Sequence, residues 1–175
     1  MKSFGPRLRR IALAGLVAIA GSAATPALAG KADVELLKSY VGDWKGRGQL
    51  VGAEKETVVC KLALTPGNQD KVNYSGRCAL AGTTLSVNGS LAFSDVNKRY
   101  EAAMTSNVSF SGLAVGKRQG DTVVFDLKER NKDEAGNDLT VTARIVLAAD
   151  KINVGFHVVF NATGDSLRAE VPFSK

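Results

Sequence analysis

The residues able to act as nucleophiles, bases or metal ligands are few in this 175-residue sequence: one histidine, His157, and two cysteines, Cys60 and Cys78. A serine or cysteine nucleophile needs a histidine base within hydrogen-bond reach, and a structural zinc site takes about four Cys or His ligands. His157 alternates with apolar neighbours, so we expect its imidazole to face solvent. We therefore predict that the chain is not an enzyme and has no metal site.

Carboxylates and phosphate-binding loops give no stronger signal. Asp126 and Glu101 could form an acid–base pair, but both alternate with apolar residues on the side of their segments expected to face solvent. The sequence Gly46-Arg47-Gly48 lacks the helix that a phosphate-binding loop introduces. We expect no catalytic residue and no cofactor.

Cys60 and Cys78 are predicted to form a disulfide bond. Two alternating segments, residues 56–64 and 71–80, flank a stretch of Pro, Gly, Asn and Asp that is typical of turns. The hairpin register that sets the two cysteines opposite each other also gathers the apolar residues of both segments on one face. A redox-active pair is the alternative, but nothing nearby would stabilise a thiolate. The bridge indicates an oxidising compartment, where disulfides persist.

Residues 1–29 are predicted to be a secretory signal peptide. A basic stretch ends at Arg10, an apolar run covers residues 11–20, and small residues precede a cleavage point after Ala29. The apolar run is about half of the roughly 20 residues that a membrane span needs. We expect residues 30–175 to form a single domain in the periplasm or outside the cell, with no integral membrane segment.

The charge balance excludes the strongly basic classes of protein. The chain has 23 Lys and Arg against 17 Asp and Glu, but four of the cations and none of the acids precede residue 30. The remainder holds 19 cations against 17 acids, a net charge of +2. Nucleic-acid-binding and polybasic membrane-surface proteins need clustered cations, so we expect no nucleic-acid partner.

The rest of the chain follows the alternation of β-strands. About ten alternating segments, joined mostly by short turns, succeed one another between Trp44 and Phe173. Short connections favour antiparallel neighbours, and closing the sheet removes its exposed edges. We predict an all-β fold, an antiparallel up-and-down β-barrel of about 8–10 strands with a short N-terminal helix at residues 32–41. A two-sheet sandwich is the alternative.

The motif Gly42-Asp43-Trp44, after the expected helix, resembles the Gly-x-Trp opening of the calycins: lipocalins, fatty-acid-binding proteins and avidins. The resemblance implies that Trp44 closes one end of the barrel beside a cation from the last strand. Arg168 is the candidate for that cation.

Residues 36–48 (LLKSYVGDWKGRG) are also similar to the opening of nitrobindin-type haem barrels. Those barrels ligate haem through a histidine near the C-terminus. This chain has no histidine after His157, so it departs from the family there, and we expect no bound haem.

The resemblance favours a lipocalin-like barrel that binds a small hydrophobic or amphipathic ligand. Small residues expected to face inward would leave space for it, namely Gly76, Ala102, Gly112 and Ala143. The side chains expected to line the site are Trp44, Tyr74, Met104, Phe110 and Phe156. A packed core without a cavity is the alternative.

A protein-interaction module is the second function that fits. Small exported barrels that inhibit proteases resemble this chain in their Gly-x-Trp opening and hairpin disulfide. Such an inhibitor would insert its N-terminal segment, here residues 30–34, into the cleft of a periplasmic protease.

Overall fold

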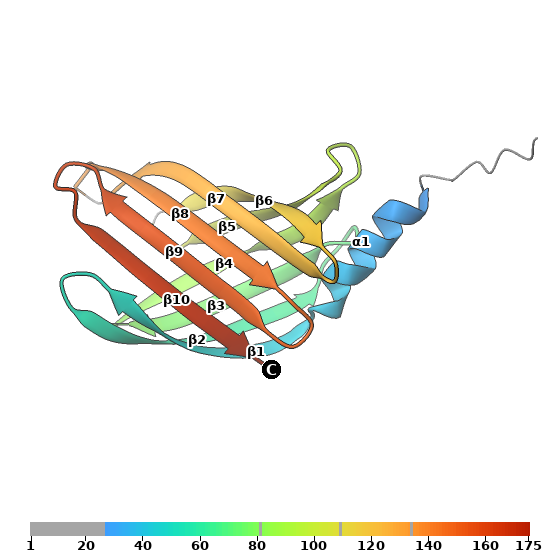
Figure 1. Ribbon diagram of the computed structural model, residues 1–175, viewed down its shortest axis with the longest axis horizontal. Coiled ribbons are helices and arrows are strands. Elements are labelled where there is room, and N and C mark those ends of the chain that lie inside the picture. Colours follow the sequence, from blue (N-terminus) through green and yellow to red (C-terminus); the bar gives the residue numbers. More distant parts are fainter. Residues whose placement is uncertain (1–26, 81, 109, 134) are drawn as a thin grey trace, which may run out of the picture.

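The computed structural model describes residues 27–80, 82–108, 110–133 and 135–175. Most of the predicted signal peptide, residues 1–26, lies outside the described residues, so the signal stays a prediction. The described residues form a closed antiparallel β-barrel with one helix at its end (Figure 1). The elements in chain order are α1 (Ala27–Ser39), β1 (Gly42–Val51), β2 (Lys55–Pro66), β3 (Val72–Leu80), β4 (Thr83–Ser94), β5 (Arg99–Ser106), β6 (Ser111–Gln119), β7 (Thr122–Lys132), β8 (Asp138–Leu147), β9 (Ile152–Phe160) and β10 (Ser166–Ser174).

Consecutive strands are neighbours throughout the barrel. The hydrogen-bonded order runs from β2 to β10, and β1 closes the barrel by pairing with both β2 and β10. Every one of these pairs is antiparallel, as short connections require. The predicted up-and-down barrel is therefore confirmed, and the two-sheet sandwich is wrong.

The β2–β3 hairpin has the register expected from its cysteines. Cys60 lies opposite Cys78, and Leu64 lies opposite Tyr74. The two cysteines form the predicted disulfide, with their Cα atoms 4.0 Å apart. The bridge and the apolar alternation therefore select one pairing, as the sequence indicated.

The interior is densely packed at the end of the barrel next to α1. The side chains that are fully buried there include Tyr40, Trp44, Tyr100, Phe125 and Ile152. Toward the other end, several inward hydrophobic side chains are only partly buried, among them Met104, Phe110 and Phe156. Because core side chains of these types are normally well buried, this gradient indicates unfilled space in the half away from α1.

Strands β1 and β6, on opposite sides of the barrel, present glycines inward. A Cβ atom at Gly46 would lie 2.7 Å from Cδ1 of Phe173, and one at Gly116 would lie 2.7 Å from Cδ1 of Phe125. The missing side chains let these two rings lie against the wall of the barrel. This arrangement explains why glycine interrupts the apolar alternation of both strands.

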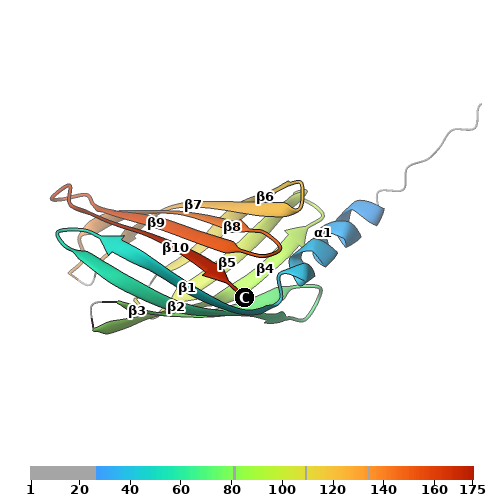
Figure 2. The same ribbon diagram turned by 60° about the horizontal axis from the view of Figure 1, so that its bottom comes forward.

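Helix α1 covers one end of the barrel (Figure 2). It begins at Ala27 and ends at Ser39, so it starts earlier than the predicted residues 32–41, in keeping with the high helix propensity of Ala and Leu. Gly42 follows with a φ of +145°, which favours glycine. Leu37 is fully buried against the barrel. In the described part of the chain, no helix combines the length and apolar character of a membrane span.

Candidate ligand cavity

The half of the barrel away from α1 contains a cavity of about 500 Å³. Small-molecule sites in proteins usually measure about 300–1,000 Å³, so the space suits a ligand of that size. Strands β2 to β5 and β7 to β10 provide the walls, which consist almost entirely of aliphatic and aromatic side chains. Typical members of the lining are Leu62, Val87, Leu91, Val141, Val154 and Val158.

The cavity reaches solvent at the end of the barrel opposite α1. Val108, which is 58% exposed, borders it there. Polar residues enter the lining mainly at this mouth: Ser106, Asn131, Lys132 and Asp133. The Nζ atom of Lys132 lies 2.8 Å from Oδ1 of Asp138. The site is thus apolar inside and polar at its rim.

Four of the five side chains predicted to line a ligand site border this cavity: Tyr74, Met104, Phe110 and Phe156 do, and Trp44 does not. Leu62 and Val154 were not singled out from the sequence, although they occupy inward positions of the same alternating strands. Ala102 and Gly76 both border the cavity, but at Gly76 the side chain of Val87 fills the expected space, because its Cγ2 lies 2.8 Å from the Cβ position. At Gly112 the expected space is filled, because atoms of Phe110 and Leu127 lie 3.1 and 3.2 Å from its Cβ position.

Trp44 lies at the closed end of the barrel instead. Its indole is 1% exposed, and Nε1 donates a hydrogen bond of 3.1 Å to the carbonyl of Tyr40. The cation beside it is Lys175, whose Nζ lies 4.8 Å from the ring centroid, within the range of a cation–π contact. The prediction of Arg168 in this role is wrong, because Arg168 is an exposed residue that alternates with inward Leu167 and Ala169.

The side chain of Tyr74 lies along the wall of the cavity, from β3 across β4 to β5. Its hydroxyl donates a hydrogen bond of 3.0 Å to the carbonyl of Ala103 on β5, two strands away. The ring passes over Gly89 of β4, where a Cβ atom would lie 2.5 Å from the Tyr74 hydroxyl. Burial raises the pKa of Tyr74 well above its usual range. The hydroxyl is therefore neutral and already partnered, and the ring offers the cavity an apolar face.

The disulfide is part of the cavity wall. Cys60 and Cys78 both border the space, and Cys60 is 2% exposed. The bridge links β2 and β3 at a point where Gly76, two residues away on β3, provides no side chain. It therefore adds a covalent link between two neighbouring strands of the wall.

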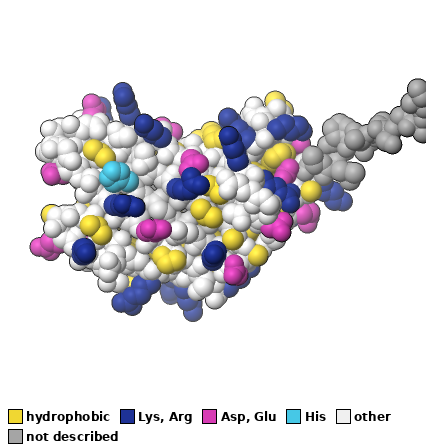
Figure 3. Space-filling model, in the orientation of Figure 1, with side chains coloured by type: hydrophobic (Ala, Val, Ile, Leu, Met, Phe, Trp, Pro, Cys, Tyr) yellow, Lys and Arg dark blue, Asp and Glu magenta, His cyan; other side chains and the backbone are white. Residues whose placement is uncertain are grey.

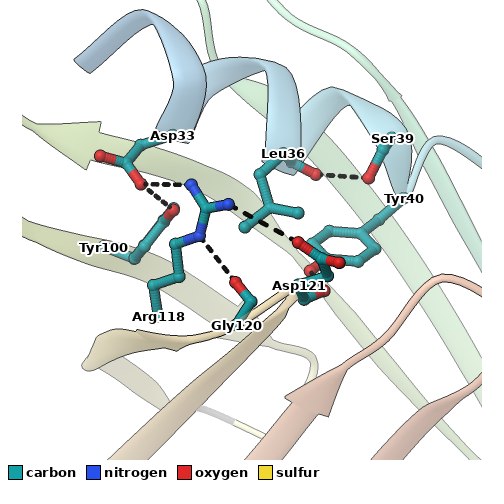
Figure 4. A network of polar contacts seen from close by, with 8 residues as sticks. All are labelled: Asp33, Leu36, Ser39, Tyr40, Tyr100, Arg118, Gly120 and Asp121. Atoms are coloured by element: carbon teal, nitrogen blue, oxygen red, sulfur yellow. Dashed lines mark hydrogen bonds and ion pairs between the residues drawn. The ribbon is translucent and has the colours of Figure 1, made fainter. Parts of the chain in front are cut away.

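A polar network attaches α1 to the closed end (Figure 4). The Tyr100 hydroxyl donates a hydrogen bond of 2.6 Å to Oδ1 of Asp33, and Nη1 of Arg118 lies 3.4 Å from the same oxygen. The Tyr40 hydroxyl donates to the carbonyl of Asp121 at 2.9 Å. Burial raises the pKa of Tyr40 to about 12, and burial together with Asp33 raises the pKa of Tyr100 further. These contacts close the barrel at the end where its interior is filled.

The histidine and the two carboxylates considered for catalysis lie outside the barrel. Figure 3 shows the imidazole of His157 on the outer surface, whereas its neighbours Phe156 and Val158 border the cavity, so the expected outward orientation is confirmed. Asp126 is paired with Arg144 at 3.0 Å and Glu101 with Arg99 at 2.8 Å. Among the described residues, no group of three or more His, Cys, Asp or Glu side chains could hold a metal ion.

Comparison with known proteins supports the fold. No protein-family model matches the sequence, and no curated protein matches it significantly. The structure is similar to that of Rv2717c from M. tuberculosis, with a TM-score of 0.61 and 14% identity over 79% of this chain and 94% of that chain. It is also similar to the S-type phycobiliprotein lyase CPES from Guillardia theta, with a TM-score of 0.52 and 11% identity over 83% and 96% of the two chains. Likenesses at such low identity establish the fold alone, and they fit a calycin-like barrel.

Proposed function

We propose that the protein is an exported lipocalin-like barrel that binds a small hydrophobic or amphipathic molecule. The observation that carries this proposal is the cavity of about 500 Å³ with its apolar lining and its mouth opposite α1. The disulfide is compatible with a periplasmic or secreted location. The similar structure of a phycobiliprotein lyase is consistent with a barrel of this kind serving a small molecule.

The lining favours a ligand with a long apolar part and at most one polar end. Groups able to hydrogen-bond border the cavity mainly at the mouth, at Ser106, Asn131 and Lys132. A polar group placed deeper would lose its hydration without gaining a partner, which is costly. An amphipathic ligand would therefore enter with its apolar end toward α1 and keep its polar end at the mouth.

The proposal is tested by a substitution that places a larger side chain in the cavity. Ala102 is 1% exposed and borders the cavity, whereas its neighbour Ala103 is exposed on the outer face. We expect Ala102→Leu to weaken saturable binding of an apolar fluorescent dye by at least about tenfold, since overfilling a packed site costs about 1–3 kcal/mol. Ala103→Leu adds the same side chain outside and is expected to bind the dye as the unmodified protein does.

Dye titration is combined with mass spectrometry of an organic extract of the purified protein. Co-purified lipid and saturable dye binding, both lost in Ala102→Leu, would support the cavity as the site. If extract and titration both show nothing, or if Ala102→Leu and Ala103→Leu bind dye equally, the ligand-binding function is contradicted.

Protease inhibition gains no support from the structure. Residues 30–34 belong to helix α1, and Asp33 within them is bonded to Tyr100 and Arg118. In the conformation described, this segment is helical and bonded to the barrel, so insertion into the cleft of a protease would require it to leave these contacts.

A further inference from the structure

Four cations lie close together on the outer face of β1, β2 and β3. The strand registers place Lys45 directly opposite Lys61 and Lys61 directly opposite Arg77. Arg47 is the next outward residue on β1. We call these four residues the basic face. All of them are exposed, and Figure 3 shows Lys and Arg side chains along the lower edge of the molecule, where Figure 1 draws β1 and β2.

The basic face is not neutralised by the protein. Within the described part of the chain, none of its four residues takes part in an ion pair within 4.0 Å. Asp43, an acidic residue on the same face of β1, does not pair with any of them. Other cations of the barrel do have acidic partners, for example Arg99 with Glu101 and Arg144 with Asp126. Four cations without an acidic partner among the described residues therefore lie next to one another on this wall.

Such an arrangement has a cost for the isolated protein. Like charges directly opposite each other on neighbouring strands are destabilising, and here three stand in one row. The same wall also exposes two apolar side chains, Val59 at 46% and Val51 at 40%. Val59 lies directly opposite Arg47, so apolar and cationic groups alternate on this surface.

We propose that the basic face docks the barrel, side on, against an anionic phospholipid membrane. Each Lys or Arg near an anionic lipid surface adds about fivefold to the partitioning of a protein onto it, and the exposed valines suit the boundary between headgroups and acyl chains. A single-stranded nucleic acid fits less well, because it needs aromatic stacking platforms, and the aromatic residues of β1 to β3, Trp44 and Tyr74, are directed inward. The docking does not depend on whether the cavity is occupied.

The test measures binding of the purified protein to vesicles. Sedimentation is compared for vesicles of phosphatidylglycerol mixed with phosphatidylcholine and for vesicles of phosphatidylcholine alone, at low and high salt. The variant of the basic face carries Gln at all four of its positions. The control carries Gln at four exposed cations of other regions and has the same net charge: Lys98, Lys128, Arg144 and Lys151.

We expect binding to the anionic vesicles alone, weakened by salt because exposed charges are screened. The basic-face variant should lose at least about tenfold in partitioning, and the control should stay within about twofold of the unmodified protein. The double variant Lys61→Gln/Arg77→Gln, checked by circular dichroism, keeps the test decisive if the fourfold variant does not fold. Equal losses in variant and control, absence of vesicle binding, or binding to a DNA oligonucleotide without binding to vesicles would each overturn the proposal.

Discussion

At the scale of single residues, the tyrosines carry the clearest electrostatic consequence of burial. The chain has three tyrosines, and burial raises the pKa of each: Tyr40 to about 12, and Tyr74 and Tyr100 further. Each hydroxyl is a donor to a carbonyl or carboxylate of the barrel or helix. A tyrosinate could not donate, so the folded state requires the neutral form.

This requirement predicts that stability is lost at alkaline pH. An unfolded tyrosine titrates near pH 10, and the folded chain keeps its protons to higher pH. The stabilisation is therefore fully present below about pH 10 and falls as the pH rises through the raised folded values. We expect tyrosinate absorbance to increase together with the loss of the β-sheet circular dichroism signal.

The variant Tyr74→Phe serves as the control for this prediction. It keeps the ring in the cavity wall and removes one of the three ionising groups, so the fall in stability per pH unit should become shallower by about one third. Tyrosinate that forms near pH 10 in a fully folded protein would contradict the assigned burial.

At the scale of the elements, the attachment of α1 depends on Asp33. The carboxylate accepts a hydrogen bond from Tyr100, which is 1% exposed. Asp33→Ala leaves that buried hydroxyl without its partner, a loss of about 1–3 kcal/mol in the free energy of unfolding. Hydrogen exchange in α1 should become faster by a larger factor than exchange in β7 or β8, because the helix is detached first.

Glu35→Ala is the matched control on the same helix. Glu35 is exposed and lies 3.4 Å from Lys38, so its removal should change stability by less than about 0.5 kcal/mol. If the two variants are equally stable, the network of Figure 4 does not hold the helix.

The elements themselves were predicted well from the sequence, but their distant contacts were not. Alternation defined the strands, and the positions of the two cysteines determined the β2–β3 register. The partners of Asp33 are 67 and 85 residues away in the chain, at Tyr100 and Arg118, and local periodicity carries no information at that separation. The cation beside Trp44 was misplaced for a related reason: Lys175 follows the last strand and belongs to no alternating pattern.

At the scale of the whole molecule, composition concealed how charge is distributed. A net charge of +2 after residue 29 gave no reason to expect a basic surface. The basic face is formed by residues from three strands, and only their registers show that Lys45, Lys61 and Arg77 lie in one row. A sequence pattern gives the face on which a side chain lies but not its neighbour across the sheet.

The sequence also did not show where the interior is densely packed. This distribution of packing predicts how local stability varies along the barrel. Residues near α1 such as Trp44 and Tyr100 are fully buried and do not border the cavity, whereas Met104 and Phe156, which do border it, are only partly buried. Regions with fewer buried contacts open at lower free energy. We expect backbone amides next to α1 to exchange most slowly and those around the mouth to exchange faster.

A bound ligand should remove this difference, because it supplies the contacts that the half of the barrel with the cavity lacks. Saturation with an anilinonaphthalene dye is expected to slow exchange in the strand segments around the cavity and to leave the end next to α1 unchanged. Ala102→Leu should abolish the effect of the dye, since its side chain occupies the same space, and Ala103→Leu should preserve it. Uniform protection along the barrel, or protection that survives in Ala102→Leu, would mean that the dye binds elsewhere and that the cavity of about 500 Å³ is not the ligand site.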